Sequence, residues 1–464
     1  MMLLLLLTFL HTSEIHAMDN LNVAFRWKVV DFEFPNDTAR ENAITKGIFI
    51  PENNLPLGVE VYGNRMFISV PRWKSGVAAS LNYIMLTDPK DSPKLRPYPN
   101  WEYHDLTHTD ESGMVPPDKI VSPFRVRADS CGRLWVVDTG VADILEGSKV
   151  LSKPKLFIFD LNTDTLIRSY QIPEDQMKKD VSFFANIAVE ENGCDDTYAY
   201  LADLGHPGLV VYSYKKNKSW LVKHHYFHIS PTAGEMTVAG ITFQWADGIF
   251  GLALSKPDEA GYSTLYFHPM HSFHEFTVST KLLRDETLAT DPKNFHEFKV
   301  LGSRGPKAQS GASFLHQKTN VLFYTLLNLN AVACWRTTNP NYTMESQGRV
   351  FMSNETMVFP NDIKVDANDI LWVMSDKLPV FMYDKLNPSE YNFRILNSTV
   401  ADAIRGTACD SKMVMNPSIV KNITKNITRT TSAVATAGSS PIRSVNVQMI
   451  WVVLTFAALS LTTR

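Results

Sequence analysis

The sequence predicts an all-β protein, a six-bladed β-propeller, on two observations. Residues 359–376 (FPNDIKVDANDILWVMSD) contain an alternating strand, turn-forming residues at 367–369 and a continuously apolar strand at 370–374. Related patterns begin near residues 57, 124, 185, 238, 312 and 361. Such a unit cannot bury its own faces and needs neighbours of the same kind. Radial closure of six four-stranded units hides most sheet edges.

Each predicted blade begins with two strands joined by a turn. The first strand alternates apolar and polar residues, as in a sheet buried on one face, and the second is more continuously apolar. In chain order these pairs lie at 57–70, 124–138, 185–203, 238–254, 312–326 and 361–374.

Shorter apolar runs after these pairs are predicted to be the outer strands. The segment 25–34 (FRWKVVDFEF) precedes the first pair, and we expect it to supply the outer strand of the last blade and close the ring. The other outer strands are predicted at 156–160 and 166–172 in the second blade, 209–214 and 220–222 in the third, 265–268 in the fourth, 332–335 in the fifth, and 380–383 and 392–396 in the sixth.

The composition is that of one large globular domain. The chain has 464 residues, of which 44% are hydrophobic, enough to form a sizeable core. We assign residues 18–410 to the propeller. The net charge is −3, from 45 basic and 48 acidic residues, and gives no electrostatic basis for binding nucleic acid.

Both ends of the chain carry targeting patterns. Residues 1–17 resemble a secretory signal peptide: the first ten are nearly all apolar, Ala17 closes a cleavage site, and a basic n-region is lacking. A Ser/Thr-rich stalk is predicted at 411–440 and a hydrophobic tail at 441–464. Small residues, a polar spacer and an apolar run of 13 residues match a glycosylphosphatidylinositol (GPI) attachment signal. A marginal membrane helix is the alternative. We therefore expect a secreted or surface-anchored protein.

Glycosylation sequons support secretion. Asn-x-Ser/Thr marks a surface acceptor in a secreted chain. The sequons are at Asn36, Asn217, Asn341, Asn354, Asn397, Asn422 and Asn426.

The four cysteines are predicted to form two disulfides. Four cysteines allow three pairings. Cys131 and Cys194 occupy equivalent turns of the second and third units, and equivalent turns of adjacent blades lie on one face. Cys131–Cys194 would therefore join neighbouring blades, which leaves Cys334–Cys409. In an oxidising compartment, four free thiols are the less favoured alternative.

Polar residues on the inner strands are the candidate site, because these strands line the central channel. Asn186, Asn361 and Asp362 begin inner strands of the third and sixth units, and Asn330 precedes a strand of the fifth. Their oxygens could anchor a small polar ligand, hold Ca²⁺, or only cap turns, the commonest use. The histidine-rich stretches lack metal-ligand spacing, so we predict no metal site and no cofactor, with Ca²⁺ in the channel as the alternative.

Several long segments resemble the Yellow/major royal jelly protein family of insects. They are SPFRVRADSCGRLWVVDTG, FANIAVE, TYAYLADLG, VAGITFQWADGIFGLAL, LNAVACW, FPNDIKVDANDILWVMSD and IRGTACD, in order between about residues 25 and 409. The resemblance implies a secreted, glycosylated six-bladed propeller. It also implies a role in cuticle pigmentation and melanin formation, by dopachrome conversion in some members and by binding of biogenic amines in others.

Two functions follow as expectations, and the sequence does not decide between them. The first is an enzyme that converts dopachrome-type intermediates. The second is a non-catalytic binding or patterning protein that holds an aromatic amine or indole in the channel. In either case Asn361 and Asp362 are the first anchors and Asn186 and Asn330 the second, with Asp362 also a candidate base. A third alternative is a Ca²⁺-dependent propeller hydrolase, because PNDIKVD also resembles lactonase propellers.

The anchor hypothesis predicts that the tail is cleaved near Ser439 and replaced by a lipid. Phosphatidylinositol-specific phospholipase should then release the protein from cell surfaces. Protein that stays bound, with residues 449–461 still detectable by mass spectrometry, would instead indicate a membrane helix.

Overall fold

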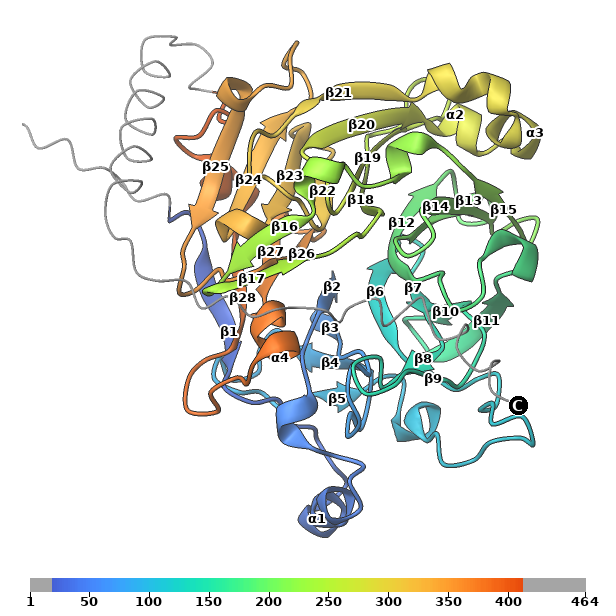
Figure 1. Cartoon of the computed structure of the whole chain (residues 1–464), viewed down its shortest axis with the longest axis vertical. Coiled ribbons are helices and arrows are strands. Elements are labelled where there is room, and N and C mark those ends of the chain that lie inside the picture. Colours follow the sequence, from blue (N-terminus) through green and yellow to red (C-terminus); the bar gives the residue numbers. More distant parts are fainter. Residues whose placement is uncertain (1–18, 412–464) are drawn as a thin grey trace, which may run out of the picture.

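The computed structural model describes residues 19–411 and contains six four-stranded antiparallel sheets arranged as a propeller (Figure 1). This confirms the predicted fold class. The signal peptide, the Ser/Thr-rich stalk from residue 412 onward, Asn422, Asn426 and the hydrophobic tail lie outside the described residues. Within residues 19–411, no helix is long and apolar enough to cross a membrane.

The first three blades follow the predicted order from the axis outward. Each is a meander whose first strand in the chain is innermost. Blade one has β2 (Gly58–Tyr62), β3 (Arg65–Ser69), β4 (Leu81–Met85) and β5 (Arg96–Pro97); blade two has β6 (Pro123–Ala128), β7 (Arg133–Asp138), β10 (Lys155–Asp160) and β11 (Thr165–Gln171); blade three has β12 (Phe184–Glu191), β13 (Thr197–Asp203), β14 (Gly208–Ser213) and β15 (Lys218–Val222).

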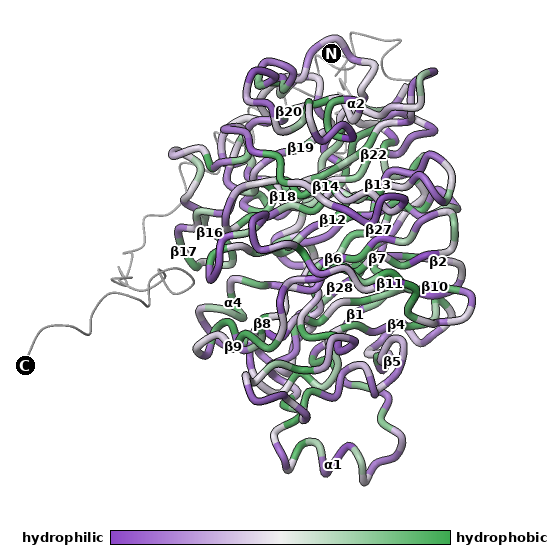
Figure 2. Tube along the Cα trace, turned by 90° about the vertical axis from the view of Figure 1, so that its right-hand side faces the viewer, coloured by the Kyte–Doolittle hydropathy of each residue, from purple (hydrophilic) through white to green (hydrophobic). Residues whose placement is uncertain are grey.

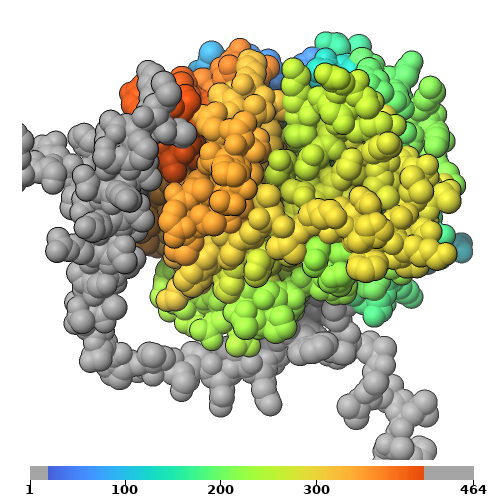
Figure 3. Space-filling view, turned by 90° about the horizontal axis from the view of Figure 1, so that it is seen from above, coloured from blue at the N-terminus to red at the C-terminus, as the bar shows by residue number. Residues whose placement is uncertain are grey.

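Blades four and five are also meanders and lie side by side (Figure 3), whereas blade six takes its outer strand from the N-terminus. Blade four has β18 (Ile249–Leu254), β19 (Thr264–Pro269), β20 (His274–Ser279) and β21 (Lys299–Ser303); blade five has β22 (Ser313–His316), β23 (Val321–Leu326), β24 (Ala331–Arg336) and β25 (Gln347–Met352); blade six has β26 (Pro360–Val365), β27 (Ile370–Ser375), β28 (Phe393–Thr399) and β1 (Asn22–Trp27).

The remaining elements are short and sit in the connections. Two hairpins, β8 (Val141–Ala142) with β9 (Lys149–Val150) and β16 (Glu235–Val238) with β17 (Ile241–Gln244), stand outside the blades. The α-helices are α1 (Asp37–Thr45), α2 (Thr280–Leu283), α3 (Glu286–Thr290), α4 (Leu378–Tyr383) and α5 (Val400–Ile404), and the 3₁₀ turns are Pro51–Asn53, Trp101–His104, Glu174–Gln176, His225–Phe227, Pro231–Ala233, Pro292–Glu297, Leu327–Leu329 and Met344–Ser346.

The ring is closed by β1, as predicted. β1 pairs antiparallel with β28, from Asn22 opposite Asn397 to Trp27 opposite Phe393. The strand starts before the predicted segment 25–34 and ends at Trp27, because the chain then leaves blade six and Phe32 bridges to Leu95 beside blade one. The N-terminal segment therefore links the last blade to the first.

Two predicted strand assignments were wrong. The apolar run 380–383 is not a strand: it lies in α4, where Pro379 occupies the first turn and Leu378 and Phe381, three residues apart, are both buried. The predicted inner strand of blade four near 238 belongs to the hairpin β16–β17, which turns at Ala239–Gly240, and the blade begins instead at Ile249. The prediction failed because a hairpin outside the blades has the same strand–turn–strand sequence pattern as the inner strand pair of a blade.

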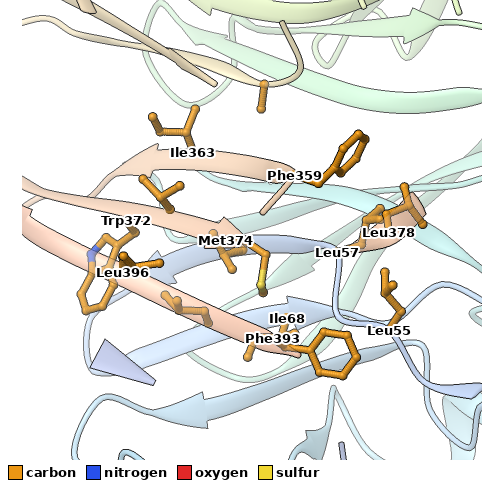
Figure 4. Packing of buried hydrophobic residues seen from close by; sticks show 14 of the residues in the cluster. Leu55, Leu57, Ile68, Phe359, Ile363, Trp372, Met374, Leu378, Phe393 and Leu396 are labelled. Atoms are coloured by element: carbon orange, nitrogen blue, oxygen red, sulfur yellow. The ribbon is translucent and has the colours of Figure 1, made fainter. Parts of the chain in front are cut away.

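The core fills the space between blades. One large cluster joins blades six and one through side chains from β26, β27, β28, β2 and β3 (Figure 4). In Figure 2 hydrophobic stretches follow the blade strands, and α1 protrudes from the body. Members labelled in Figure 4 are Leu55, Leu57, Ile68, Phe359, Ile363, Trp372, Met374, Leu378, Phe393 and Leu396.

Both predicted disulfides are confirmed. Cys131 and Cys194, with Cα atoms 5.7 Å apart, join the turn between β6 and β7 to the turn between β12 and β13. Cys334 on β24 bonds Cys409, with Cα atoms 6.3 Å apart, and fastens the segment after α5 to blade five. Each bridge therefore joins parts that the sheets alone do not connect.

The five sequons in the described residues differ in exposure. Four of these asparagines are exposed, whereas Asn397 lies half-buried in β28, between β1 and β27. Glycosylation at all of them stays a prediction. The exposed four are Asn36, Asn217, Asn341 and Asn354.

Closure by β1 predicts that Trp27→Ala destabilises the whole propeller. Trp27 is buried and its Nε1 donates to the Pro93 carbonyl at 2.8 Å. Loss of a buried Trp should cost about 3–5 kcal/mol of unfolding free energy, measured by urea denaturation. Val300→Ala, at an exposed position of β21, is the control and should change it by less than about 0.5 kcal/mol. A cost below about 1 kcal/mol for Trp27→Ala would contradict closure by β1.

Candidate functional site

The candidate site lies at the end of the channel where the inner strands begin. The inner strands contact one another in a ring, β2–β6–β12–β18–β22–β26 and back to β2 (Figure 1). In an antiparallel meander the start of the first strand and the end of the second share one side of the sheet. The loops before the inner strands and after the second strands therefore surround this mouth. α4 and the hairpin β16–β17 belong to these loops.

Irregular pairing marks the start of four inner strands. The register shifts between Pro123 and Val126, Phe184 and Asn186, Ile249 and Gly251, and Pro360 and Asp362. An extra residue in one strand re-aims the side chains around it and is frequent beside functional sites. The residues inside these irregularities include Arg125, Phe250 and Asn361.

Three buried and mutually bonded residues, Arg125, Asn361 and Asp362, form what we call the channel floor. Arg125 lies at its centre. Its guanidinium is fully buried, and Nη2 donates to Asn361 Oδ1 at 2.6 Å and to the Asn361 carbonyl at 2.9 Å. Its Nε lies 3.5 Å from Asp362 Oδ2, and the guanidinium stacks 5.2 Å from the centre of the Phe250 ring. Arg125 therefore links the inner strands of blades two, four and six.

Asp362 is fully buried, and its carboxylate is enclosed by donors. Oδ1 accepts from Lys364 Nζ at 2.7 Å and from its neighbour's backbone N–H at 2.9 Å. Oδ2 accepts from the Val59 N–H at 2.9 Å and also faces Arg125. Both oxygens of this carboxylate are therefore occupied by contacts within the protein. Its role as ligand anchor or base stays a prediction.

Asn361 extends the floor to a second buried acid. Its Nδ2 donates to Asp376 Oδ2 at 2.7 Å, and Asp376 Oδ1 accepts from the Leu378 N–H at the start of α4. Burial raises the pKa of Asp376 to about 8, although the bond from Asn361 opposes the shift. Asn361 thus connects Arg125 to the base of α4.

The other two predicted anchors join blades at the same level of the fold. Asn186 Nδ2 donates to the Phe250 carbonyl at 2.7 Å and so ties blade three to blade four. Asn330 has left-handed backbone geometry (φ +48°), and its Oδ1 accepts from the Phe359 N–H at 3.1 Å. The structure therefore gathers Asn361 and Asp362 around Arg125 and gives Asn186 and Asn330 bonds to backbone.

Two groups of aromatic side chains surround the mouth. In the first, the ring of Phe124 lies 5.3 Å from Trp73 and 4.6 Å from Phe183. In the second, the ring of Trp245 lies 4.5 Å from Phe243, 5.9 Å from Phe359 and 6.5 Å from Tyr383. Trp73, Phe183, Trp245 and Tyr383 are only half-buried, so aromatic surface remains open to a ligand.

Asp247 is an acid at the mouth without a partner for its charge. It lies half-buried in the loop before β18, and no donor among residues 19–411 bonds its carboxylate. Its backbone is held by His271: the Asp247 N–H donates to His271 Nδ1 at 3.1 Å, and the Asp247 carbonyl accepts from the His271 N–H at 3.3 Å. Burial without a compensating bond raises the pKa of Asp247 to about 7.

Asp247, Trp245, Tyr383 and Arg125 were not predicted as site residues. Trp245 and Asp247 stand in the stretch FQWADG, whose pattern predicts part of an inner strand pair. The signal that could have found them is an aromatic residue and an acid directly before a glycine at an inner-strand start. Nothing in the sequence around Tyr383 or Arg125 indicates a site.

The described residues contain no group of three or more His, Cys, Asp or Glu side chains that could hold a metal. A cavity of about 400 Å³ lies beside α4, and another of about 240 Å³ lies beside α3. The first is lined by Lys74, Phe381 and the segment 51–54 among others, and the second by His224 and Phe298 among others. Neither contains Asp247, Trp245 or Arg125.

Comparison with known proteins places the chain among insect relatives. The model of the family "Major royal jelly protein" matches residues 121–409. Protein yellow of Drosophila madeirensis is 41% identical over 412 residues, covering 88% of this chain and 70% of the relative. Protein yellow of Drosophila melanogaster is 41% identical over 399 residues, covering 85% and 71%. A solved luciferin-regenerating enzyme aligns at 9% identity and a TM-score of 0.42, covering 75% of this chain and 91% of that one.

The floor geometry predicts a large stability cost for Asp362→Asn. The change removes the one carboxylate that faces both Arg125 and Lys364 and leaves two buried cations uncompensated. Removing one partner of a buried ion pair costs about 3–5 kcal/mol, which urea denaturation would measure. Asp384→Asn, an exposed change at the end of α4, should cost less than about 0.5 kcal/mol. Equal stabilities for the two variants would contradict this account.

Proposed function

Because this chain belongs to the major royal jelly protein family, with the Yellow proteins of Drosophila among its relatives, we propose that it acts in pigmentation by converting dopachrome-type intermediates of melanin formation. The family relation supports the role in pigmentation. The reaction and the ligand are inferred from the mouth of the channel. The proposed ligand is a small aromatic amine or indole.

One observation carries the ligand class: half-buried aromatic rings surround an acid that has no partner. The faces of Trp245 and Tyr383 suit stacking against a catechol or indole ring. The Asp247 carboxylate suits the ammonium of an aromatic amine.

The floor supports the mouth from below. Arg125, Asn361 and Asp362 are bonded to one another and buried, and Asn361 reaches Asp376 at the base of α4. We assign these residues to positioning α4, and hence Tyr383, rather than to direct contact with the ligand. The amide of Asn186 similarly holds the backbone at Phe250.

A non-catalytic amine-binding protein is the second candidate. The unpaired Asp247 favours it, because a half-buried carboxylate among aromatic rings also makes a receptor for a protonated amine. The calcium-dependent hydrolase is less favoured: Asp362, its first oxygen ligand, already faces Lys364 and Arg125, and cation neighbours oppose metal binding.

Secretion is part of the proposal. Two disulfides formed in the described residues and four exposed sequons are the pattern of a protein that matures in an oxidising compartment. Attachment to the cell surface through the C-terminal tail is the further expectation from the sequence.

The reaction is tested by incubating the purified protein with dopachrome and following the loss of its colour. A boiled sample measures the spontaneous reaction. We expect faster loss with the folded protein. Binding of dopamine and serotonin by calorimetry, with no acceleration of dopachrome loss, would favour the second candidate. No heat change with either amine and no acceleration would contradict both.

The aromatic rim predicts that Trp245→Ala weakens serotonin binding about tenfold, which corresponds to ~1.4 kcal/mol and is the scale of one stacked aromatic pair. Calorimetry measures the affinity. Trp101→Ala is the matched control, because the half-buried Trp101 stacks on Phe34, outside the two groups at the mouth. It should leave the affinity unchanged, and circular dichroism should show both variants folded. An unchanged affinity in Trp245→Ala would remove this ring from the site.

A further inference from the structure

An unused acceptor and an unused donor face the mouth from different elements. The acceptor is the Asp247 carboxylate in the loop before β18, which no donor in residues 19–411 bonds. The donor is the Tyr383 hydroxyl at the end of α4. Its oxygen accepts from Trp245 Nε1 at 2.5 Å, so its own hydrogen points elsewhere. No acceptor for that hydrogen is found in the described part of the chain.

Trp245 brings the two groups near each other. It is bonded to Tyr383 through its indole N–H and stands two residues before Asp247 on one loop. Burial first, and then the nearby charge of Asp247, raise the pKa of Tyr383. The carboxylate and the hydroxyl are therefore close without being hydrogen-bonded to each other.

His271 holds this loop from the neighbouring turn. It follows β19 and makes two bonds to the Asp247 backbone, one through Nδ1 and one through its own N–H. Burial lowers the pKa of His271 to about 4, so the ring is neutral, and because Nδ1 accepts, the hydrogen is on Nε2. That buried Nε2 has no partner. His271 is a positioning residue for Asp247.

We propose that Asp247 is the general base and Tyr383 the general acid in the isomerisation of an aminochrome, a dihydroindole quinone, to a dihydroxyindole. This assignment rests on the proposed function and names the groups that would carry it. The half-buried ring of Trp245, which is hydrogen-bonded to Tyr383 and stands two residues before Asp247, is the surface on which the ligand ring would stack.

The chemistry balances without any oxidant or reductant. Asp247 removes a proton from a saturated carbon of the five-membered ring, and the electron pair of that C–H bond becomes a C=C bond of the ligand. A quinone C=O becomes C–OH by taking the proton of Tyr383. The proton on Asp247 then returns to the tyrosinate through solvent. A second transfer, from the other saturated carbon to the other quinone oxygen, yields the dihydroxyindole, an isomer of the starting compound.

The proton affinities suit these roles. A base works best when its pKa lies near the operating pH, and burial brings that of Asp247 to about 7. The raised pKa of Tyr383 keeps its proton in place until the quinone oxygen becomes basic. The titratable groups that face Asp247 are His271 from the turn after β19 and Tyr383 from α4. His271 is neutral above pH 5, so it adds no charge that changes with pH in the working range.

The test uses the purified full-length protein and dopaminechrome, an aminochrome without a carboxyl group. Its colour loss gives kcat and KM after subtraction of the spontaneous rate. Asp247→Asn should lower kcat at least about 100-fold and Tyr383→Phe at least about tenfold, within the range of general acid–base catalysis. KM should change less than about threefold, because both variants keep the shape of the site. Asp384→Asn and Tyr391→Phe are the matched controls and should keep wild-type kcat.

Two further readouts separate a chemical role from a structural one. Binding of the neutral probe 5-hydroxyindole, measured by calorimetry, should be unchanged in Asp247→Asn and Tyr383→Phe. The kcat/KM of the wild type should fall about tenfold per pH unit below about pH 7, because protonation removes the base. In Asp247→Asn, kcat/KM should no longer fall with decreasing pH below about pH 7.

The outcomes are distinct. Wild-type kcat in either variant, with 5-hydroxyindole binding intact, overturns the assignment of that residue. A kcat/KM that is flat from pH 5.5 to 8 overturns Asp247 as the base. Wild-type protein that binds 5-hydroxyindole without accelerating dopaminechrome loss overturns the catalytic inference and leaves ligand binding at the mouth in place. Neither binding nor acceleration overturns the proposed function as well.

Discussion

The pairing of β1 with β28 is the constraint on which the rest of the structure depends. A propeller of open sheets would expose the edge of its last blade, and an unpaired edge is a template for aggregation. Here the N-terminal strand covers that edge and joins the sequence ends of the domain. Closure also sets the radius at which six inner strands meet. The candidate site lies at the mouth where those strands converge.

The convergence of the inner strands buries charged side chains at the axis, and the residues of the floor pair these charges with one another. Arg125, Lys364 and Asp362 are all buried there, where isolated charges would be costly. Asp362 pairs with both cations, the backbone N–H of Val59 donates to Asp362, and Asn361 accepts from Arg125. The result is a buried floor whose side chains are bonded to one another. The proposed ligand site therefore lies above the floor, among the loops.

The mouth leaves several polar groups unused, whereas among Arg125, Asn361 and Asp362 only Arg125 Nε is buried without a hydrogen bond. Among residues 19–411, the Asp247 carboxylate accepts no hydrogen bond, the hydrogen of the Tyr383 hydroxyl has no acceptor and His271 Nε2 has no partner, although buried polar groups are normally bonded. Phe359, which packs on Trp245, also has a positive φ of 49°, an unfavourable conformation for a bulky residue. Unpaired groups and backbone strain concentrate where a scaffold positions loops for function. A rigid floor with an unsatisfied rim is the arrangement expected of a binding site.

The sequence by itself determined the propeller, its closure by the N-terminal strand and both disulfides, because each depends on local pattern and on equivalence between repeats. It did not separate the helix α4 from a strand, since a short apolar run has no period long enough to decide. The hairpin β16–β17 was mistaken for an inner pair for the same reason. The site depended on contacts that no local pattern contains. Arg125 contacts Asn361, which is 236 residues away in the sequence. Because of this contact, Asn361 and Asp362, predicted as ligand anchors, are instead bonded to Arg125 in the floor. Asp247 became the candidate base only because the fold buries it without giving it a partner, and burial and bonding are properties of the tertiary structure.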